Sequence, residues 1–87
     1  MALGIVQVTV SDFAKWRPVF MKMESMRAAG GITNPRIYRN ADSGNDVLVL
    51  FDVAEVAKWH EGVRSPELKA AMQEAGVLGP PKTHIIP

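Results

Sequence analysis

"RIYRNADSGNDVLVLF", residues 36–51, is the stretch of sequence that decides the fold. Two runs with strand character, 36–40 and 47–51, flank the cluster "ADSGND", 41–46, whose residue types favour a turn. The short connection predicts a β-hairpin. The second run is apolar at every position, so we expect a strand that is covered on both faces and lies in the middle of a sheet.

A strand and an amphipathic helix precede the hairpin. Residues 4–10, "GIVQVTV", place the three valines on one side of a strand and Gln7 and Thr9 on the other. Ser11 or Asp12 can cap the helix that follows. Its apolar stripe has spacings of three and four residues and consists of Phe13, Trp16, Phe20 and Met23.

Two breaks bound this helix. Pro18 suits the first turn of a helix better than its middle, so the helix either starts late or is kinked there. "AAGG", residues 28–31, ends it.

A helix follows the hairpin. Asp52 and Glu55 have the spacing of a capping box, with Asp in place of the usual Ser or Thr. In the helix after them, Val56, Val63 and either Trp59 or His60 should point toward the core.

A second helical piece and a last strand complete the chain. Ser65 and Pro66 restart the helix as its N-cap and first residue, and Gly76 ends it. The apolar stripe of this piece is Leu68, Ala71, Met72 and Ala75. "GPP", 79–81, then straightens the chain into a strand over 82–86.

The order βαββαβ predicts an α+β, ferredoxin-like fold, with a four-stranded antiparallel sheet and helices on one face. Residues 1–87 would form one domain. The other face of the sheet would be bare and partly apolar, and a second copy of the same sheet is the simplest cover for it. We therefore expect a symmetric homodimer, a dimeric α/β barrel whose paired sheets enclose cavities.

Composition excludes several function classes. The chain has ten basic and nine acidic residues, and without a Lys/Arg run it lacks the charge pattern of a nucleic-acid binder. It has no cysteine, which excludes disulfides and thiolate metal sites and favours a cytoplasmic protein. No apolar run approaches the length of a membrane span, so we expect no membrane partner.

The runs "YRN", "VLVLF" and "SPELKAAMQEAGVLGPP" resemble the dimeric α/β-barrel superfamily, and most of all its small cyclase-like or antibiotic-biosynthesis-monooxygenase-like bacterial proteins. The resemblance covers nearly the whole chain. It implies an apolar cavity between sheet and helices that takes a small molecule. The superfamily includes polyketide cyclases, cofactor-free monooxygenases of quinol-type aromatics, muconolactone isomerases and haem-degrading enzymes.

The haem-degrading branch fits least well. Met72 aligns with the histidine that binds iron in that branch, and Gln7 stands where an asparagine is expected. The resemblance therefore implies an enzyme without a cofactor.

Three residues are candidates for proton transfer. His60 and His84 offer imidazole groups, which commonly act as general acids or bases, and Tyr38 offers a phenol. Each also has a purely structural interpretation. His60 can be a histidine on the helix surface, His84 a histidine at a solvent-exposed strand edge, and Tyr38 a half-buried tyrosine. The two histidines lack the close spacing and third ligand of a metal site, so we expect no metal.

Six residues are candidates for substrate binding. Arg36 and Asn40 share one face of their strand with Tyr38, and Gln7 and Thr9 are polar positions on a central strand. Of the adjacent residues Trp59 and His60, Trp59 is better suited to form the wall of a pocket. Met72 is an adaptable side chain that fills a core or a pocket.

The leading hypothesis is a cofactor-independent, cyclase-like enzyme that performs acid–base chemistry on an aromatic or polyketide-like substrate. One alternative is cofactor-free monooxygenation of a quinol-type aromatic. The other is a non-catalytic small-molecule binding or accessory protein, because a fold does not fix a function.

Overall fold

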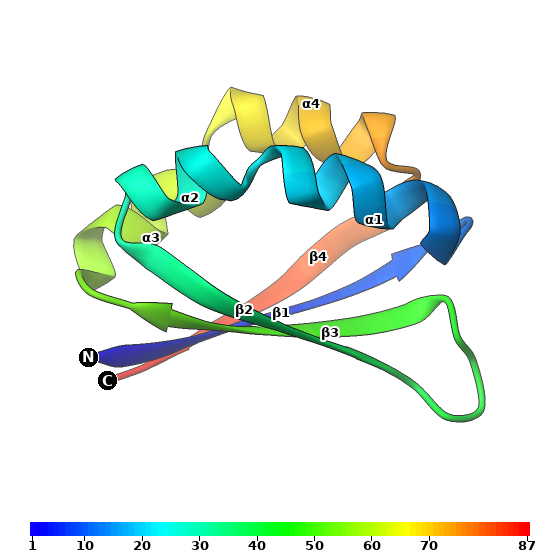
Figure 1. Cartoon of the computed structure of the whole chain (residues 1–87), viewed down its shortest axis with the longest axis horizontal. Helices are drawn as coiled ribbons and strands as arrows, with labels where there is room; N and C mark the ends of the chain where they lie inside the picture. Colours follow the sequence, from blue (N-terminus) through cyan, green and yellow to red (C-terminus); the bar gives the residue numbers. More distant parts are fainter.

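The computed structural model describes residues 1–87, which form a four-stranded sheet covered by helices on one side (Figure 1). Eight elements follow one another: β1 (Ala2–Val10), α1 (Phe13–Lys22), α2 (Glu24–Ala29), β2 (Ile32–Arg39), β3 (Asp46–Val53), α3 (Val56–Val63), α4 (Pro66–Glu74) and β4 (Val77–Ile86). None of these helices has the length and apolar character that a membrane crossing requires.

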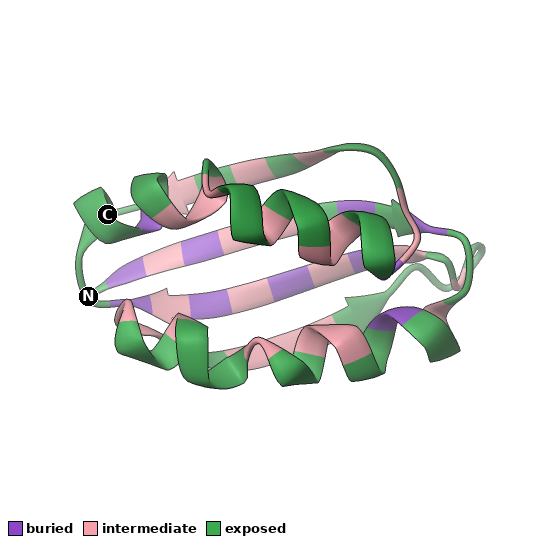
Figure 2. Cartoon of the chain, turned by 90° about the horizontal axis from the view of Figure 1, so that it is seen from above, coloured by how far each residue is buried: buried purple, intermediate pink, exposed green.

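The sheet confirms the ferredoxin-like βαββαβ prediction. All its pairings are antiparallel and its strand order is β2-β3-β1-β4, so β3 is a central strand as its apolar sequence indicated. Figure 2, seen from above, shows α1 and α2 along one edge and α3 and α4 along the other, with the buried positions concentrated on the two central strands.

Side-chain alternation gives the sheet two different faces. On the face toward the helices, Val8, Val10, Val47, Val49 and Val53 are buried with exposed fractions of 5% or less. Residues opposite one another across a ladder share a face. The other side, which we call the open face, therefore carries Leu3, Ile5, Gln7, Thr9, Arg36, Tyr38, Leu48, Leu50, Asp52, Lys82 and His84.

Both edge strands are longer than predicted. β2 begins at Ile32, where it pairs with Val53, and passes through an irregularity between Thr33 and Arg36 at which Asn34 takes a φ of 53°. β4 begins at Val77 and includes the prolines that we expected to precede it. An edge strand tolerates proline because one side of its backbone has no partner strand.

The first helix differs from the prediction in where it breaks. It starts at Phe13, capped by the Asp12 carboxylate that accepts from the Ala14 N–H, and continues through Pro18. The late start is therefore wrong, and the helix is interrupted instead at Met23, between α1 and α2.

The capping box at Asp52 and Glu55 is also wrong. Asp52 belongs to β3, which continues to Val53 because both neighbouring strands pair with it there. α3 starts after Glu55 without a side-chain cap, and Val56 in its first turn is exposed rather than inward. At α4 the Ser65 hydroxyl accepts from the Leu68 N–H as predicted, and Gly76 takes the left-handed conformation that ends the helix.

Trp59 points inward and His60 outward, which settles the alternative that the sequence left open. Trp59 is 3% exposed, whereas His60 lies on the solvent side of α3. The indole packs directly over β1 at Gly4, where a Cβ would lie only 2.5–3.0 Å from three of its carbon atoms. Glycine is therefore required at this position of the strand.

We predict that Gly4→Ala lowers the free energy of unfolding by about 1–3 kcal/mol, because the added methyl overlaps the Trp59 ring. Urea unfolding followed by tryptophan fluorescence measures the change. The control is Gly62→Ala in α3, where a Cβ meets only the Ile32 Cδ1 at 3.8 Å. That substitution should leave stability unchanged or raise it by up to about 1 kcal/mol. Equal effects of the two substitutions would contradict this packing.

Candidate functional site

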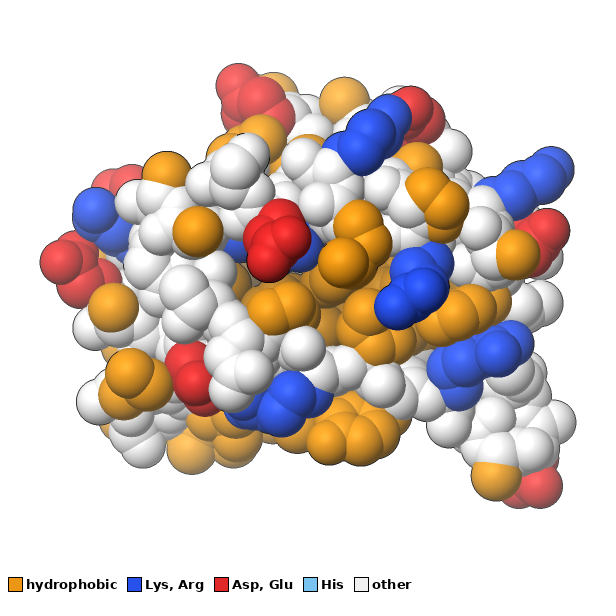
Figure 3. All heavy atoms as spheres, in the orientation of Figure 1, with side chains coloured by type: hydrophobic (Ala, Val, Ile, Leu, Met, Phe, Trp, Pro, Cys, Tyr) orange, Lys and Arg blue, Asp and Glu red, His pale blue; other side chains and the backbone are white.

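A cavity of about 260 Å³ lies between the helices and the helix-covered face of the sheet. Its floor is formed by Val6 and Val8 of β1 and by Val49 and Phe51 of β3. The helices supply most of its walls, which include Trp16, Phe20, Trp59, Val63, Leu68, Ala71 and Met72. Hydrophobic side chains gather in the middle of the face formed by α1, α2 and β2, with both basic and acidic side chains at their border (Figure 3).

A line of aromatic rings crosses the molecule along this cavity. Ring centroids lie 4.8 Å apart for Trp16 and Phe20, and 6.0 Å apart both for Phe20 and Phe51 and for Phe51 and Trp59. Phe13 extends the line at 5.7 Å from Trp16. Flat ring faces of this kind favour a flat, apolar ligand.

Arg27 is the cavity residue that sequence reasoning missed. Its Nη1 donates to the Phe20 carbonyl oxygen at 2.9 Å, and its guanidinium lies over the Phe20 ring at 3.9 Å. Its Nη2 is buried without a hydrogen-bond partner. Burial lowers the pKa of Arg27, while the nearby Glu24 carboxylate acts in the opposite direction. The guanidinium still remains charged at neutral pH.

The sequence does carry a signal for Arg27. The stripe of Phe13, Trp16, Phe20 and Met23 continues with the same spacing to position 27. A charged residue on the apolar side of a helix is an informative exception, and Arg27 is that exception here.

Two of the predicted site residues line the cavity, namely Trp59 and Met72. His60 is exposed on α3 and does not line it. Five other candidates lie on the open face, on the far side of the sheet from the cavity: Gln7, Thr9, Arg36, Tyr38 and His84. Tyr38 is 52% exposed there.

The open face brings several of these residues into register. Arg36 lies opposite Leu50, Leu50 opposite Ile5, and Ile5 opposite His84, which forms one row across all four strands. Tyr38 and Gln7 both lie opposite Leu48 in the next row. The sequence therefore identified a real group of neighbours, although on the opposite face from the helix-side cavity.

Two of the polar candidates have structural partners. The Thr9 hydroxyl donates to the Asp46 carboxylate at 2.9 Å, which ties β1 to β3. Asn40 holds the hairpin turn, because its backbone N–H donates to the Asp46 carbonyl and its side-chain oxygen accepts from the Asp42 N–H at 2.8 Å.

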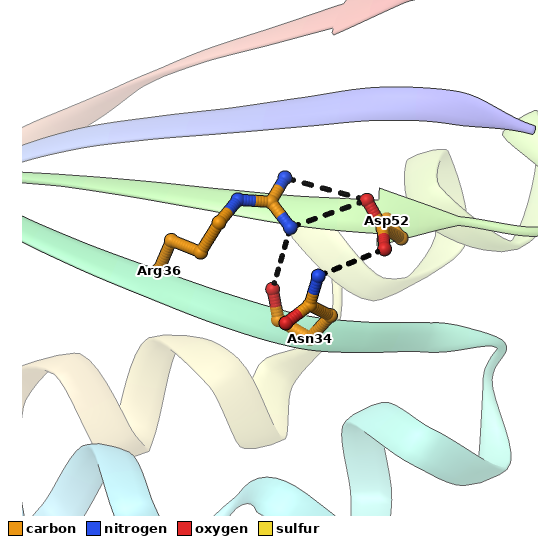
Figure 4. A network of polar contacts seen from close by, with 3 residues as sticks. All are labelled: Asn34, Arg36 and Asp52. Carbon is orange, nitrogen blue, oxygen red and sulfur yellow. Dashed lines mark hydrogen bonds and ion pairs between the residues drawn. The ribbon is translucent and has the colours of Figure 1, made fainter.

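Arg36 belongs to a polar network with Asn34 and Asp52 (Figure 4). Both terminal nitrogens of Arg36 lie 3.3 Å from the Asp52 Oδ1, and the Asn34 amide donates to the other carboxylate oxygen at 3.1 Å. The Asn34 hydrogen bond is the largest cause that lowers the pKa of Asp52; burial opposes it, and the hydrogen bond and charge of the Arg36 guanidinium lower the pKa further. The Asp52 side chain is 32% exposed, so this network links β2 to β3 in contact with solvent.

Comparisons with known proteins show the fold. No protein-family model matches the chain, and no curated protein matches its sequence. A candidate antibiotic biosynthesis monooxygenase from Bordetella bronchiseptica superposes with a TM-score of 0.79 at 12% identity, over 99% of this chain and 94% of its own.

Two further solved structures have the same fold. SnoaB, a cofactor-independent oxygenase from Streptomyces nogalater, gives a TM-score of 0.75 at 13% identity, over 99% of this chain and 90% of its own. A candidate antibiotic biosynthesis monooxygenase from Caulobacter crescentus gives 0.71 at 18% identity, over 98% and 87%. The resemblance inferred from the sequence is thus confirmed at the level of the fold.

We predict that Asp52→Asn lowers the melting temperature at pH 7, because the amide cannot accept the charged hydrogen bonds of Arg36. A carboxyl whose pKa is lowered by folding stabilises the folded state above its ordinary pKa, and this contribution is lost as the pH falls through the lowered value. The difference between the variant and the wild type should therefore shrink between about pH 5 and pH 2, the range over which carboxyl groups titrate.

The control is Asp42→Asn, which removes the same charge from the exposed hairpin turn. It should change the melting temperature little at either pH. A difference between Asp52→Asn and wild type that stays constant with pH would contradict the stabilising role of the ionised network.

Proposed function

We propose that this chain is a cofactor-independent small-molecule enzyme whose aromatic or polyketide-like substrate occupies the cavity between helices and sheet. One observation carries the proposal: an apolar cavity of about 260 Å³ is walled by aromatic rings and lined by one guanidinium side chain, that of Arg27. Small-molecule sites combine apolar walls with a few polar groups in this way, and commonly have volumes of about 300–1,000 Å³. The size favours a small substrate with one or two fused rings.

The polar groups of the cavity favour stabilisation of a negatively charged oxygen. Cyclase-like chemistry passes through an enolate, and a fixed guanidinium stabilises the charge that develops on its oxygen. The proton-transfer roles assigned to His84 and Tyr38 require a second site, because both side chains lie on the open face. A second copy of the chain packed on that face would provide such a site.

Cofactor-free oxygenation of a quinol-type aromatic is the alternative. It is supported by the ring-lined walls and by the shared fold with SnoaB, which is itself a cofactor-independent oxygenase. Oxygenation consumes dioxygen whereas cyclisation does not, so turnover that persists without air would contradict this alternative. A non-catalytic binder would raise its melting temperature with a ligand and show no turnover.

A homodimer is part of the proposal. The open face carries Ile5, Leu48 and Leu50 on its central strands without any helix to cover them. A sheet face with apolar side chains at its centre and polar ones around them has the composition of an interface. A second copy would cover it with the same surface.

We predict that the wild-type protein is a dimer at micromolar concentration in light scattering, and that Leu48→Lys converts it to a monomer. The substitution places two charges at the centre of a symmetric interface, where they are desolvated without partners. The control is Val56→Lys, because Val56 is exposed on α3 rather than on the open face, and this variant should remain a dimer. A monomeric wild type would contradict the dimer.

We predict that Ala71→Leu weakens binding of the fluorescent apolar probe N-phenyl-1-naphthylamine by about tenfold, or about 1.4 kcal/mol. Ala71 lines the cavity, so the larger side chain occupies part of the ligand volume. Ala70→Leu is the matched control, because Ala70 is the exposed neighbour on the same helix. Probe fluorescence measures the affinity of all three proteins.

Two outcomes of the probe-binding experiment would contradict the proposed function. If the wild type does not bind the probe, the cavity is not a ligand site and the proposed function fails. If Ala71→Leu and Ala70→Leu bind as the wild type does, the probe occupies another surface and the proposal fails for this cavity.

A further inference from the structure

We infer that the ligand of the cavity carries an acidic oxygen, and that Arg27 is the residue that selects it. This inference rests on the proposed function and specifies the substrate class: a flat apolar ring system bearing a carboxylate, phenolate or enolate. Arg27 is a specificity-determining residue in this account.

The hydrogen-bonding state of Arg27 is the first argument. A guanidinium has five N–H donors in a rigid fork. The Phe20 carbonyl accepts from Nη1 at 2.9 Å, whereas Nη2 is buried and has no acceptor. Arg27 lines the cavity and the protein supplies an acceptor only to Nη1, so the fork keeps donors free for an acceptor on a ligand.

The charges around the cavity are the second argument. Three charged residues line it, Arg27, Lys58 and Lys69, and all three are cations. No Asp or Glu lines the cavity, and neither of the two ion pairs in the chain, Lys22 with Glu74 and Arg36 with Asp52, includes Arg27. Glu24, its neighbour on α2, acts on the pKa of Arg27 without lying within ion-pair distance. The cavity is therefore arranged for a negative ligand group.

The orientation of Arg27 is the third argument. Its guanidinium is stacked at 3.9 Å over Phe20 and lies 5.7 Å from the Phe51 ring. These contacts hold the fork beside the middle of the aromatic line, with Trp16 beyond Phe20 on one side and Trp59 beyond Phe51 on the other. A flat ligand packed along these rings would place an oxygen on its edge beside the Arg27 guanidinium. A charged acceptor there makes a stronger hydrogen bond than a neutral one.

A matched pair of ligands tests the inference: 2-naphthoate, which is an anion at pH 7, and 2-naphthamide, its neutral isostere. Isothermal titration calorimetry should show about tenfold tighter binding of 2-naphthoate to the wild type. Arg27→Met, which keeps an apolar stem, should remove this preference while 2-naphthamide still binds. Arg17→Met is the control, because it removes the same charge from an exposed position of α1 that does not line the cavity. Its preference should equal that of the wild type.

Arg27→Lys provides a second variant should Arg27→Met fail to fold. It keeps the charge and loses the rigid fork, so the preference should be reduced but retained. Equal affinities of the wild type for both ligands, or an unchanged preference in Arg27→Met, would overturn the inference and leave the proposed cavity intact. Binding of neither ligand would contradict the proposed function itself, and this inference with it.

Discussion

The contact between the Trp59 indole and the backbone of β1 at Gly4 is the constraint on which the rest of the structure depends. A strand position without a side chain lets the ring reach the sheet, and any Cβ there would overlap it. From Trp59 the aromatic line passes through Phe51 to Phe20 and Trp16 on α1. Helices α1 and α3 are thereby attached to the sheet through large, rigid rings. Their bulk separates the helices from the sheet and leaves the cavity between them.

The two faces of the sheet carry different side chains, and the proposed function depends on that difference. Alternation along each strand sends apolar side chains to the helices and a mixed set to the open face. The helix side is a cavity with a single buried guanidinium. The open side is a surface with a polar network at Asn34, Arg36 and Asp52, and with His84 in the same row as Arg36. In a dimer the helix side would hold the ligand, and the open face would hold the partner together with His84 and Tyr38.

The sequence predicted the fold well because its signals are local. Alternating valines in 4–10, the turn cluster before β3 and the Ser65-Pro66 helix start each act within a few residues, and all three are confirmed. The strand boundaries that the sequence did not predict depend on tertiary contacts. β3 runs past Asp52 because β1 and β2 pair with it there, and prolines sit inside β4 because that strand lies at an edge.

The site was harder to predict for a physical reason. Most of the polar candidates lie on strands. Their side chains point to the open face, because the helix side of the sheet is packed with apolar side chains. The charged residues that line the cavity, Arg27, Lys58 and Lys69, come from helices instead, and the Arg27 guanidinium lies over the Phe20 ring. Trp59 and Met72 line the cavity because the apolar stripes of their helices face the same side as the cavity.

The central claim is that the ligand binds between helices and sheet rather than on the open face. Methyl-resolved NMR during a titration with 2-naphthoate tests it most directly, because each face carries its own methyl groups. The account predicts chemical-shift changes at Val8, Val63 and Leu68, which line the cavity, with little change at Ile5 and Leu48. Changes confined to Ile5 and Leu48 would place the ligand on the open face and contradict the account.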